Sequence, residues 1–387
     1  MNVSISSLPY LKLRCGTIQY NNVVVETPGC MLYTRCCAVP HLLPDVLSEI
    51  DESLIPKLAK IDVSTCCEKP GVQCLNLFQR GIRALAGLEG YLVFCAVQDA
   101  VDVARFSYNE EKTVSVWTVS GRHKLTLESH MEVVDAFQPD WFQCLSDPAV
   151  GGTLPPKRIR KSVDRTLRFL DETLQHQERQ KQSAIPFGSI EGASLLSERL
   201  RSAKETTQRP VGGFIIEGLD YNEMVDTDIA DVLTKATDIL PEDKPRLLFG
   251  PRTPDQILNA VESGVDLFDT SYPYYLTEKG LALMLFSGCR QADDQYRPRM
   301  LVDLNDKKYA RDFTPLVDGY SYSYIHHLIQ TKEMLAGVLL MKHNLQQYLR
   351  FFQQLRSSLM NNTYHTFCMK FRIAGAGDKS RQDAVQQ

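Results

Sequence analysis

Short apolar runs alternate with amphipathic segments through the middle of the chain. The apolar runs have the length of buried strands, and the segments between them, about a dozen residues each, have helical periodicity. Strands are predicted at residues 184–192, 211–218, 245–250 and 265–269, and helices at 194–207, 229–240 and 253–264. This order is typical of βα units around a parallel sheet, either as a closed barrel or as an open doubly wound sheet.

The best-defined of these helices has clear start and stop signals. Thr253 is placed as the N-cap, Pro254 occupies the first helical position, and Gln256 completes a capping box. Gly264 follows the last periodic residue and is expected to end the helix.

The two ends of the chain follow other patterns. Two β-prone runs around Asn21-Asn22 predict a hairpin, and a second hairpin is expected around Ser120-Gly121. A basic loop at residues 151–161 precedes a predicted polar helix at 162–182. The C-terminal region returns to helical spacing, and the tail, residues 361–387, is expected to be disordered.

Composition narrows the function classes. The length of 387 residues suits one large α/β domain or two to three smaller ones. A net charge of −4 means that nucleic-acid binding would need a local basic patch. The 11 cysteines are scattered, which favours reduced thiols in an intracellular compartment. Neither a secretory leader nor a long apolar run is evident, so we expect no membrane span.

Several common catalytic motifs are absent from the sequence. It contains no GxGxxG after a strand, no GxxxxGK[ST], no GxSxG and no HExxH. Dinucleotide-binding, P-loop, α/β-hydrolase and zincin chemistries are therefore disfavoured.

Carboxylates at strand ends are the stronger candidates. Glu191 and Asp269 each follow an apolar run and precede small residues. Chemistry collects at the carboxyl ends of parallel strands in either fold. On pattern alone, a buried structural acceptor and a substrate-facing group are both open for each. Asp266 is expected to have a structural role.

Histidine and basic clusters give weaker signals. His326, His327 and His343 suggest a metal group, but a closed zinc site needs four ligands, and we interpret His343 as an ordinary helix histidine. The run "PPKRIRKSVDR" is a solvated face or a phosphate contact. Its candidate contacts are Lys157, Arg158, Arg160 and Lys161.

Five long segments resemble one known family. They are "GTIQYNNVVVETPGCM", "RPVGGFIIEG", "PRLLFGPRTPDQILNAVESGVDLFD", "LNDKKYARDFTPL" and "YIHHLIQTKEMLAGVLLMKHNLQQYL". Together they make the chain, from about Leu11 to Leu359, similar to the tRNA-guanine transglycosylases, which exchange guanine for queuine or its precursor in tRNA. The resemblance implies a (β/α)8 TIM barrel with an N-terminal β-hairpin and an inserted zinc-binding subdomain. Residues 1–387 would form a single domain, with the barrel at about 11–285 and the subdomain and last helix at about 286–360.

The resemblance also implies a mechanism and assigns positions to it. In the family an Asp attacks the ribose anomeric carbon of guanosine 34 and a second Asp handles the proton. Asp269 matches the nucleophile, but residues 92–97 replace the motif that supplies the second Asp. Ser146 stands where a base-recognising Asp is expected, and Glu191 where a Gln is expected. Gly212 and Gly213 match the glycines of the base pocket.

At the zinc-binding motif this chain departs further from the family. The family has Cys-x-Cys-x-x-Cys followed by a His on the last helix, and His343 matches that His. Where the cysteines belong, this chain reads "YSYSYIHHL". Zinc is implied by the family, but one His cannot hold it, so we expect this chain to lack the metal.

These departures imply a non-catalytic subunit with a vestigial Asp269. It would pair with a catalytic subunit as a heterodimer and support exchange of guanine for queuine at wobble position 34 of tRNAs with GUN anticodons (Asp, Asn, His and Tyr). Alternatives are an active transglycosylase or base hydrolase using Asp269, and a queuine-binding module. Self-pairing is left open. The family implies a cytoplasmic location, or one peripheral to the mitochondrial outer membrane.

Overall fold

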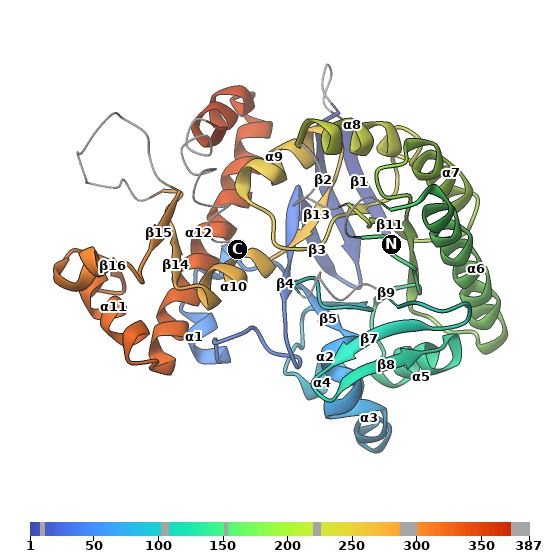
Figure 1. Cartoon of the computed structure of the whole chain (residues 1–387), viewed down its shortest axis with the longest axis horizontal. Coiled ribbons are helices and arrows are strands. Elements are labelled where there is room, and N and C mark those ends of the chain that lie inside the picture. Colours follow the sequence, from blue (N-terminus) through green and yellow to red (C-terminus); the bar gives the residue numbers. More distant parts are fainter. Residues whose placement is uncertain (8–11, 102–107, 151–153, 220–225, 287–299, 373–387) are drawn as a thin grey trace. The chain divides into compact units, whose positions relative to one another are not determined.

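The computed structural model describes residues 1–7, 12–101, 108–150, 154–219, 226–286 and 300–372 (Figure 1). Internal contacts divide the chain into two units, the first made of residues 1–38, 56–250 and 259–269 and the second of the remainder. The barrel was expected to reach about residue 285. Its last strand ends at Asp269 and the residues that follow group with the second unit, and the expected domain bounds stay a prediction.

Eight parallel strands close into a barrel in the first unit. In order around the ring they are β4 (Gly29–Tyr33), β5 (Leu58–Asp62), β6 (Leu92–Ala96), β9 (Trp141–Gln143), β10 (Ile185–Ile190), β11 (Gly213–Ile216), β12 (Arg246–Leu247) and β13 (Leu267–Asp269). The last strand pairs with the first, since Leu267 lies opposite Gly29. The alternation of strands and helices left closure open, and the structure confirms the (β/α)8 barrel.

Helical segments connect these strands. They are α2 (Val63–Cys66), a π-helical turn (Cys67–Gly71), α3 (Val72–Phe78), α4 (Gly81–Leu85), α5 (Leu127–Phe137), α6 (Pro156–Gln180), α7 (Leu196–Thr207), α8 (Asp226–Thr237) and α9 (Pro254–Glu262). The helix predicted at 162–182 starts earlier, at Pro156, because the fixed φ of proline suits the first helical turn. The basic run therefore lies on a helix and not in a loop. The capping box of α9 is confirmed, with Gln256 N donating to Thr253 Oγ1 at 3.2 Å.

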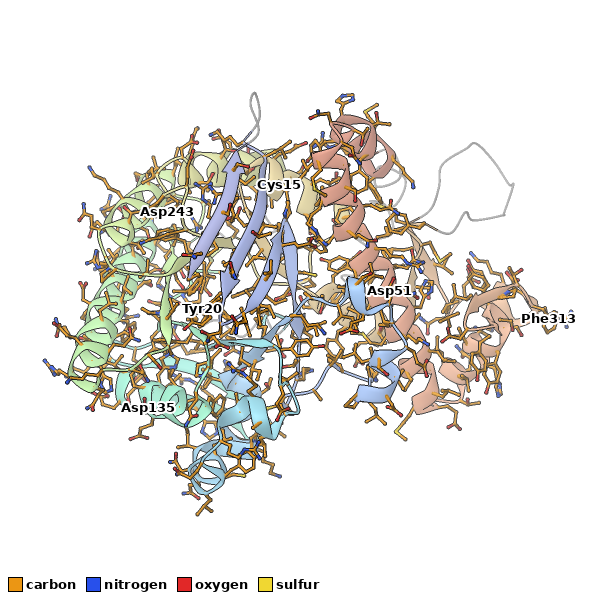
Figure 2. All side chains as sticks on the ribbon, turned by 180° about the vertical axis from the view of Figure 1, so that it is seen from behind. Cys15, Tyr20, Asp51, Asp135, Asp243 and Phe313 are labelled. Carbon is orange, nitrogen blue, oxygen red and sulfur yellow. The ribbon has the colours of Figure 1, made fainter. Side chains whose placement is uncertain are left out.

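A three-stranded antiparallel sheet packs on the amino end of the barrel. It consists of β1 (Asn2–Ser7), β2 (Arg14–Tyr20) and β3 (Val23–Thr27), and the predicted hairpin at Asn21-Asn22 joins the last two. Ile18 and Val25 are buried in one cluster with residues that begin the barrel strands, among them Leu58 and Trp141. Tyr20, labelled in Figure 2, packs its ring 6.1 Å from that of Trp141. Apolar side chains thus fill the amino end, which leaves the carboxyl end for chemistry.

Asp266 ties this sheet to the last barrel strand. Arg14 Nε of β2 donates to Asp266 Oδ1 at 2.8 Å, and the Arg246 backbone N donates to Oδ2 at 2.9 Å. Both Arg14 and Asp266 are buried. The structural role expected for Asp266 is confirmed.

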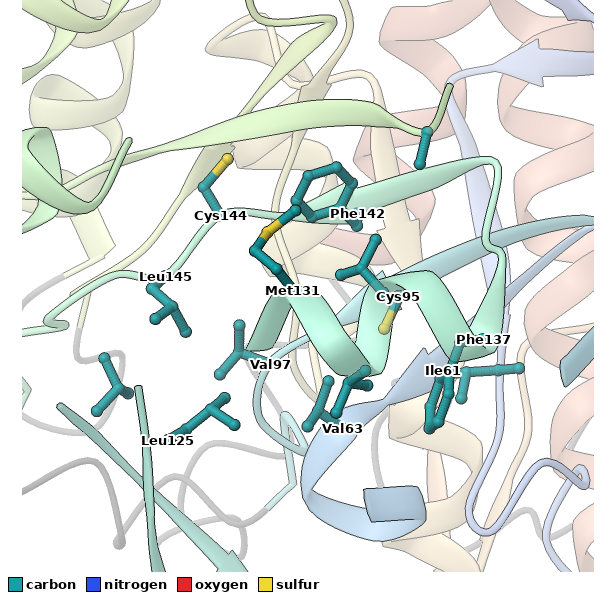
Figure 3. Close-up of a cluster of buried hydrophobic side chains, with 14 of the residues drawn as sticks. Ile61, Val63, Cys95, Val97, Leu125, Met131, Phe137, Phe142, Cys144 and Leu145 are labelled. Carbon is teal, nitrogen blue, oxygen red and sulfur yellow. The ribbon is translucent and has the colours of Figure 1, made fainter. Parts of the chain in front are cut away.

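A second apolar cluster lies between the barrel and its outer helices. Figure 3 shows Met131 and Phe137 of α5 beside Cys95 of β6 and Phe142 of β9. The second predicted hairpin is confirmed as β7 (Val114–Thr118) and β8 (Gly121–Leu125), and Leu125 joins the cluster. This cluster fixes the helices against the strands whose ends carry the polar residues.

The second unit is mostly helical. It contains α1 (Pro44–Ser48), η1 (Glu52–Leu54), α10 (Ser271–Glu278), β14 (Leu281–Leu283), β15 (Leu301–Asp303), η4 (Lys307–Arg311), β16 (Pro315–Val317), β17 (Tyr320–Ser321), α11 (Tyr322–Gln330) and α12 (Met334–Met360). The long helix confirms the C-terminal periodicity. None of the helices in the described residues is both long and apolar enough to cross a bilayer.

The tail differs from the expected disorder. Residues 364–372 are helical, and the Phe371 ring lies 5.1 Å from that of Phe351 on α12. Cys368 and Phe371 are buried, so apolar spacing holds this segment on α12. The rest of the predicted disordered tail, residues 373–387, lies outside the described residues.

Candidate functional site

Asp269 ends β13, the last strand of the barrel, and is completely buried. Its Oδ2 accepts a hydrogen bond from the backbone N of Gly250, at 3.2 Å, beyond the end of β12. The position at the carboxyl end of a barrel strand is the one that the sequence predicted. What Asp269 can do depends on the charges around it.

A buried ion pair lies on β5. Lys60 and Asp62 are two residues apart, so their side chains leave the same face of the strand. Both are fully buried, and Lys60 Nζ pairs with Asp62 Oδ1. The Lys60 ammonium also lies 5.6 Å from the ring centre of Tyr33 and 5.3 Å from that of Phe249. Such contacts between a cation and aromatic faces are attractive.

Asp99 is a third buried carboxylate at this end of the barrel. It follows β6, and Tyr33 Oη donates to it, at 2.8 Å from each carboxylate oxygen. Arg35 Nε lies 3.2 Å from Asp99 Oδ2, and the Asp99 backbone N donates to Ser64 Oγ at 2.9 Å. We call Tyr33, Lys60, Asp62, Asp99 and Asp269 the Lys60 cluster.

Burial sets the protonation of this cluster. It raises the pKa of Asp62 to about 8, although Lys60 opposes that shift. Burial also acts to lower the pKa of Lys60, but Asp62, Asp269 and Asp99 outweigh it, so the net pKa is raised. Burial raises the pKa of the Tyr33 phenol, and Asp99 adds to the shift. At neutral pH Lys60 is therefore a cation, Tyr33 is a neutral donor, and Asp62 carries a proton.

Sequence reasoning missed most of this cluster. The resemblance aligns the second Asp of the family with residues 92–97, which contain no carboxylate, whereas Asp99 lies just beyond β6. A signal was present in "LAKID", where two charges interrupt an apolar strand at alternate positions. The structure thus brings other carboxylates to Asp269, at positions that the family resemblance did not mark.

Glu191 lies at the end of β10 in a separate group. It is fully buried, and neither carboxyl oxygen has a hydrogen-bond partner among the described residues. Burial raises its pKa well above the usual range, Glu217 adds to the shift, and Arg199 opposes it. Burial therefore favours the neutral carboxylic acid of Glu191, a form that can donate as well as accept.

We give the name Glu191 cluster to four residues: Ser146, Glu191, Glu217 and Gly218. Ser146 Oγ donates to Glu217 Oε2 at 2.7 Å. Gly218 has φ +67°, and a Cβ atom there would lie 2.7 Å from Glu191 Oε2. Only glycine fits this position without strain. The structure therefore brings the predicted residues Ser146 and Glu191 together, near the ends of β10 and β11.

The predicted glycines Gly212 and Gly213 lie elsewhere. They stand at the start of β11, at the amino end of the barrel. A Cβ on Gly212 would lie 2.1 Å from Ile185 Cγ2, and one on Gly213 would lie 2.3 Å from the Phe187 ring. These two glycines allow close packing between strands, and Gly218 is the glycine beside Glu191.

The predicted phosphate-contact residues are mostly paired with acidic side chains. Arg158 holds the buried Asp147 with bonds of 2.7 and 3.0 Å. Arg160 lies 3.8 Å from a carboxylate oxygen of Glu198, and Lys161 lies 3.6 Å from one of Glu111. Lys157 is exposed and has no acidic partner in the described part of the chain. Of the four, Lys157 is the residue most available to a phosphate.

His343 is held by the backbone in the second unit. Its Nε2 lies 2.8 Å from the Leu283 carbonyl oxygen, and burial lowers its pKa to about 4, so the neutral ring donates this bond. The neighbouring Lys342 Nζ pairs with Asp318 Oδ2 at 2.6 Å and with Glu49. Among the described residues, no three His, Cys, Asp or Glu side chains are placed to share a metal. The donor set around His343 does not fit the zinc site that the family implies.

Comparisons with known proteins agree with this architecture. The family model described as queuine tRNA-ribosyltransferase matches residues 11–374. A protein named queuine tRNA-ribosyltransferase accessory subunit 2 from Pongo abelii is 38% identical over 382 residues, covering 87% of this chain and 90% of the relative. Proteins of the same name from Xenopus tropicalis and Homo sapiens are 38% and 37% identical, covering 87% of this chain and 89% and 90% of theirs. The chain therefore belongs to the queuine tRNA-ribosyltransferase family.

Proposed function

We propose that this chain is a non-catalytic accessory subunit of queuine tRNA-ribosyltransferase. One observation carries the proposal: a fully buried ammonium, that of Lys60, lies in the same cluster as Asp269, the residue at the nucleophile position. Displacement of guanine from ribose develops positive charge on the sugar. A fixed cation beside the nucleophile disfavours that transition state, whereas catalysis needs negative potential there. The name of these relatives, accessory subunit 2, supports the same role.

The partner follows from this role. The chain would form a heterodimer with a catalytic subunit that exchanges guanine for queuine at position 34 of tRNAs with GUN anticodons. The exposed Lys157 at the start of α6 supports a contribution to tRNA phosphate binding. The complex would act in the cytoplasm or at the surface of the mitochondrial outer membrane, and this subunit would function without zinc.

An exchange assay tests the proposal. Purified chain, catalytic subunit and their mixture are each given tRNA with labelled guanine at position 34, and release of label by queuine is followed. We expect no release by this chain alone and full release by the mixture, unchanged by Asp269→Asn in this chain. Robust release by the chain alone, abolished by Asp269→Asn, would overturn the non-catalytic role.

An active enzyme is the second candidate, and one observation favours it. Asp62, with its pKa raised to about 8, holds a proton near neutral pH in the same cluster as Asp269. It could serve the leaving base in place of the missing family Asp. In the same assay, activity of the chain alone that falls on Asp62→Asn would support this reading.

A queuine-binding module is the third candidate. The unpartnered acid of Glu191 beside Gly218 favours it, because a buried polar group without a partner is costly unless a ligand satisfies it. Titration calorimetry with queuine tests this reading. Binding that is lost in Glu191→Ala would support it, and no binding at high micromolar queuine would argue against it.

A further inference from the structure

A pair of adjacent cysteines forms a tight turn directly after β4. Arg35 N donates to the Ala38 carbonyl at 2.9 Å, and Ala38 N donates to the Arg35 carbonyl at 3.1 Å. The two residues between them, Cys36 and Cys37, have φ values of 48° and 69°. Turns of this kind normally use Asn or Gly at both positions, because a side chain in the left-handed region is strained. This turn instead presents two thiols.

One of these thiols meets a cysteine from another element. Cys37 Sγ lies 3.4 Å from Cys66 Sγ, at the end of α2. Cys66 is fully buried, whereas Cys37 retains 9% of its surface exposed. Both belong to the apolar cluster of Figure 3, with Ile61, Val63 and Cys95. Close packing in this cluster holds the two sulfur atoms together.

We propose that Cys37 and Cys66 are a redox-active pair that forms a reversible disulfide with hydroperoxides as the oxidant. The Cys37 thiol loses its proton, the thiolate attacks one oxygen of hydrogen peroxide, and the O–O bond breaks. The leaving hydroxide takes up the released proton, so that a sulfenic acid and water result. The Cys66 thiol then attacks the sulfenyl sulfur, the S–S bond forms as the S–OH bond breaks, and the leaving hydroxide takes the Cys66 proton to give a second water. The two thiols lose two electrons, and the peroxide gains them.

The order of attack follows from exposure. Cys37 keeps 9% of its surface exposed, and Cys66 keeps none. The hydrogen bond with Cys37 and burial both raise the pKa of the Cys66 thiol. Cys66 therefore remains protonated until the sulfenic acid forms beside it, and oxidation should accelerate as pH rises. Thiol-reducing agents reverse the reaction by exchange.

The bond can form with little rearrangement. A disulfide needs the sulfur atoms about 2.05 Å apart, so side-chain rotation must close about 1.4 Å. The bond would cross-link the end of β4 to α2 and restrict the unfolded chain, which stabilises the fold. It would also fix the turn that carries Arg35, whose Nε lies 3.2 Å from Asp99. The oxidised form should therefore melt at a temperature several degrees higher.

Peptide mapping tests the proposal. The full-length chain is treated with hydrogen peroxide, free thiols are blocked with N-ethylmaleimide, and an unreduced digest is analysed by mass spectrometry. We expect a cross-linked peptide containing Cys37 and Cys66, a free-thiol count lower by two, and a higher melting temperature, all reversed by dithiothreitol. The cross-link should be absent from Cys37→Ser and Cys66→Ser.

Two further variants act as controls. Cys36→Ser removes the exposed neighbour, whose Sγ lies 3.5 Å from the Thr65 carbonyl oxygen, and Cys74→Ser removes an exposed thiol on α3. Both should keep the cross-link. Full alkylation of Cys37 and Cys66 after peroxide treatment of the wild-type chain would overturn the proposal. So would a disulfide that joins Cys36 to either residue, or one that joins two chains. These outcomes do not depend on any variant folding.

Discussion

The hydroxyl of Tyr33 lies 2.8 Å from each carboxylate oxygen of Asp99 and joins the ends of two barrel strands that are not neighbours. β5 runs between them, and its Lys60 ammonium lies 5.6 Å from the Tyr33 ring centre. One phenol thus satisfies a buried carboxylate with its hydroxyl and faces a buried cation with its ring. Tyr33 therefore links a buried anion and a buried cation at the carboxyl end of the barrel.

Tyr33→Phe should remove the donor to Asp99 and keep the ring. A buried carboxylate that loses a hydrogen bond costs about 1–3 kcal/mol, so the free energy of unfolding should fall by that amount. Urea unfolding measures it. Tyr320→Phe, at a residue that is 39% exposed, is the matched control and should change stability by less than about 0.5 kcal/mol. Equal losses in the two variants would contradict the proposed role of the bond.

Lys60→Met should be more damaging. It leaves the buried Asp62 without its hydrogen-bond partner, which costs about 1–3 kcal/mol, and it also removes the buried cation that interacts with Asp99 and Asp269. The double variant Lys60→Met, Asp62→Leu should recover part of this loss in urea unfolding. Lys124→Met breaks the exposed pair with Glu110 and should cost less than about 1 kcal/mol. A single variant no less stable than the double variant would refute the pairing.

The pH dependence of the free energy of unfolding should reflect the titration of Asp62. Its pKa is raised to about 8 in the folded chain, while the unfolded chain has the ordinary value near 4. Between the two pKa values the folded chain holds a proton on Asp62 that the unfolded chain has lost. The resulting stabilisation is therefore complete below the unfolded pKa and is lost as pH rises through 8. It amounts to at most about 1.4 kcal/mol per pH unit in that window.

Asp62→Asn isolates this contribution. Melting temperatures of variant and wild type are measured from pH 5 to pH 8.5. Buried histidines such as His343, whose pKa is lowered, gain stability as pH rises, and the difference between the two chains removes this opposing effect. The wild-type chain should lose stability relative to the variant as pH rises. A constant difference across the range would show that Asp62 titrates normally.

Zinc removal should leave this chain unchanged. His343 donates to the Leu283 carbonyl, and Lys342 pairs with Asp318 and Glu49, so these side chains already have partners. Elemental mass spectrometry should find zinc well below stoichiometric, and a zinc chelator should not shift the melting temperature. Stoichiometric zinc that survives gel filtration would refute the proposed loss of the metal.

Two neighbours on α6 should behave differently. Lys157→Ala should weaken tRNA binding by the complex and reduce its salt dependence, because it removes a charge available to phosphate. Arg158→Ala should instead destabilise the fold, because it removes a partner of the buried Asp147. Filter binding at several salt concentrations and urea unfolding separate the two effects. A Lys157→Ala variant with unchanged affinity would exclude this contact.

Periodicity predicted the barrel elements because the spacing of apolar residues is a local property. It predicted the cap of α9 and the carboxylate at the end of β13 for the same reason. It could not predict that Lys60 and Asp99 would lie near Asp269, since they come from strands far apart in the sequence. That proximity depends on ring closure, which leaves no local signal.

The glycines near β11 show what motif similarity could not predict. "VGGFIIEG" contains three glycines, and motif similarity selected the first two. The side of the barrel on which each lies depends on where β11 begins, and strand boundaries are the least certain part of a sequence-based prediction. Only the structure shows that Gly218 approaches Glu191 and that Gly212 approaches Ile185.

The buried ion pair between Arg14 and Asp266 has a consequence for how the chain folds during synthesis. Its two residues are 252 positions apart, and the first and last strands of the barrel are neighbours in the ring. During synthesis the amino-terminal sheet leaves the ribosome early but must wait for almost the whole barrel before it meets its partner. Completion of the ring is therefore a late step of very high contact order, when exposed strand edges are most open to misassembly. A nascent chain halted before residue 269 would present β4 as an unpaired edge.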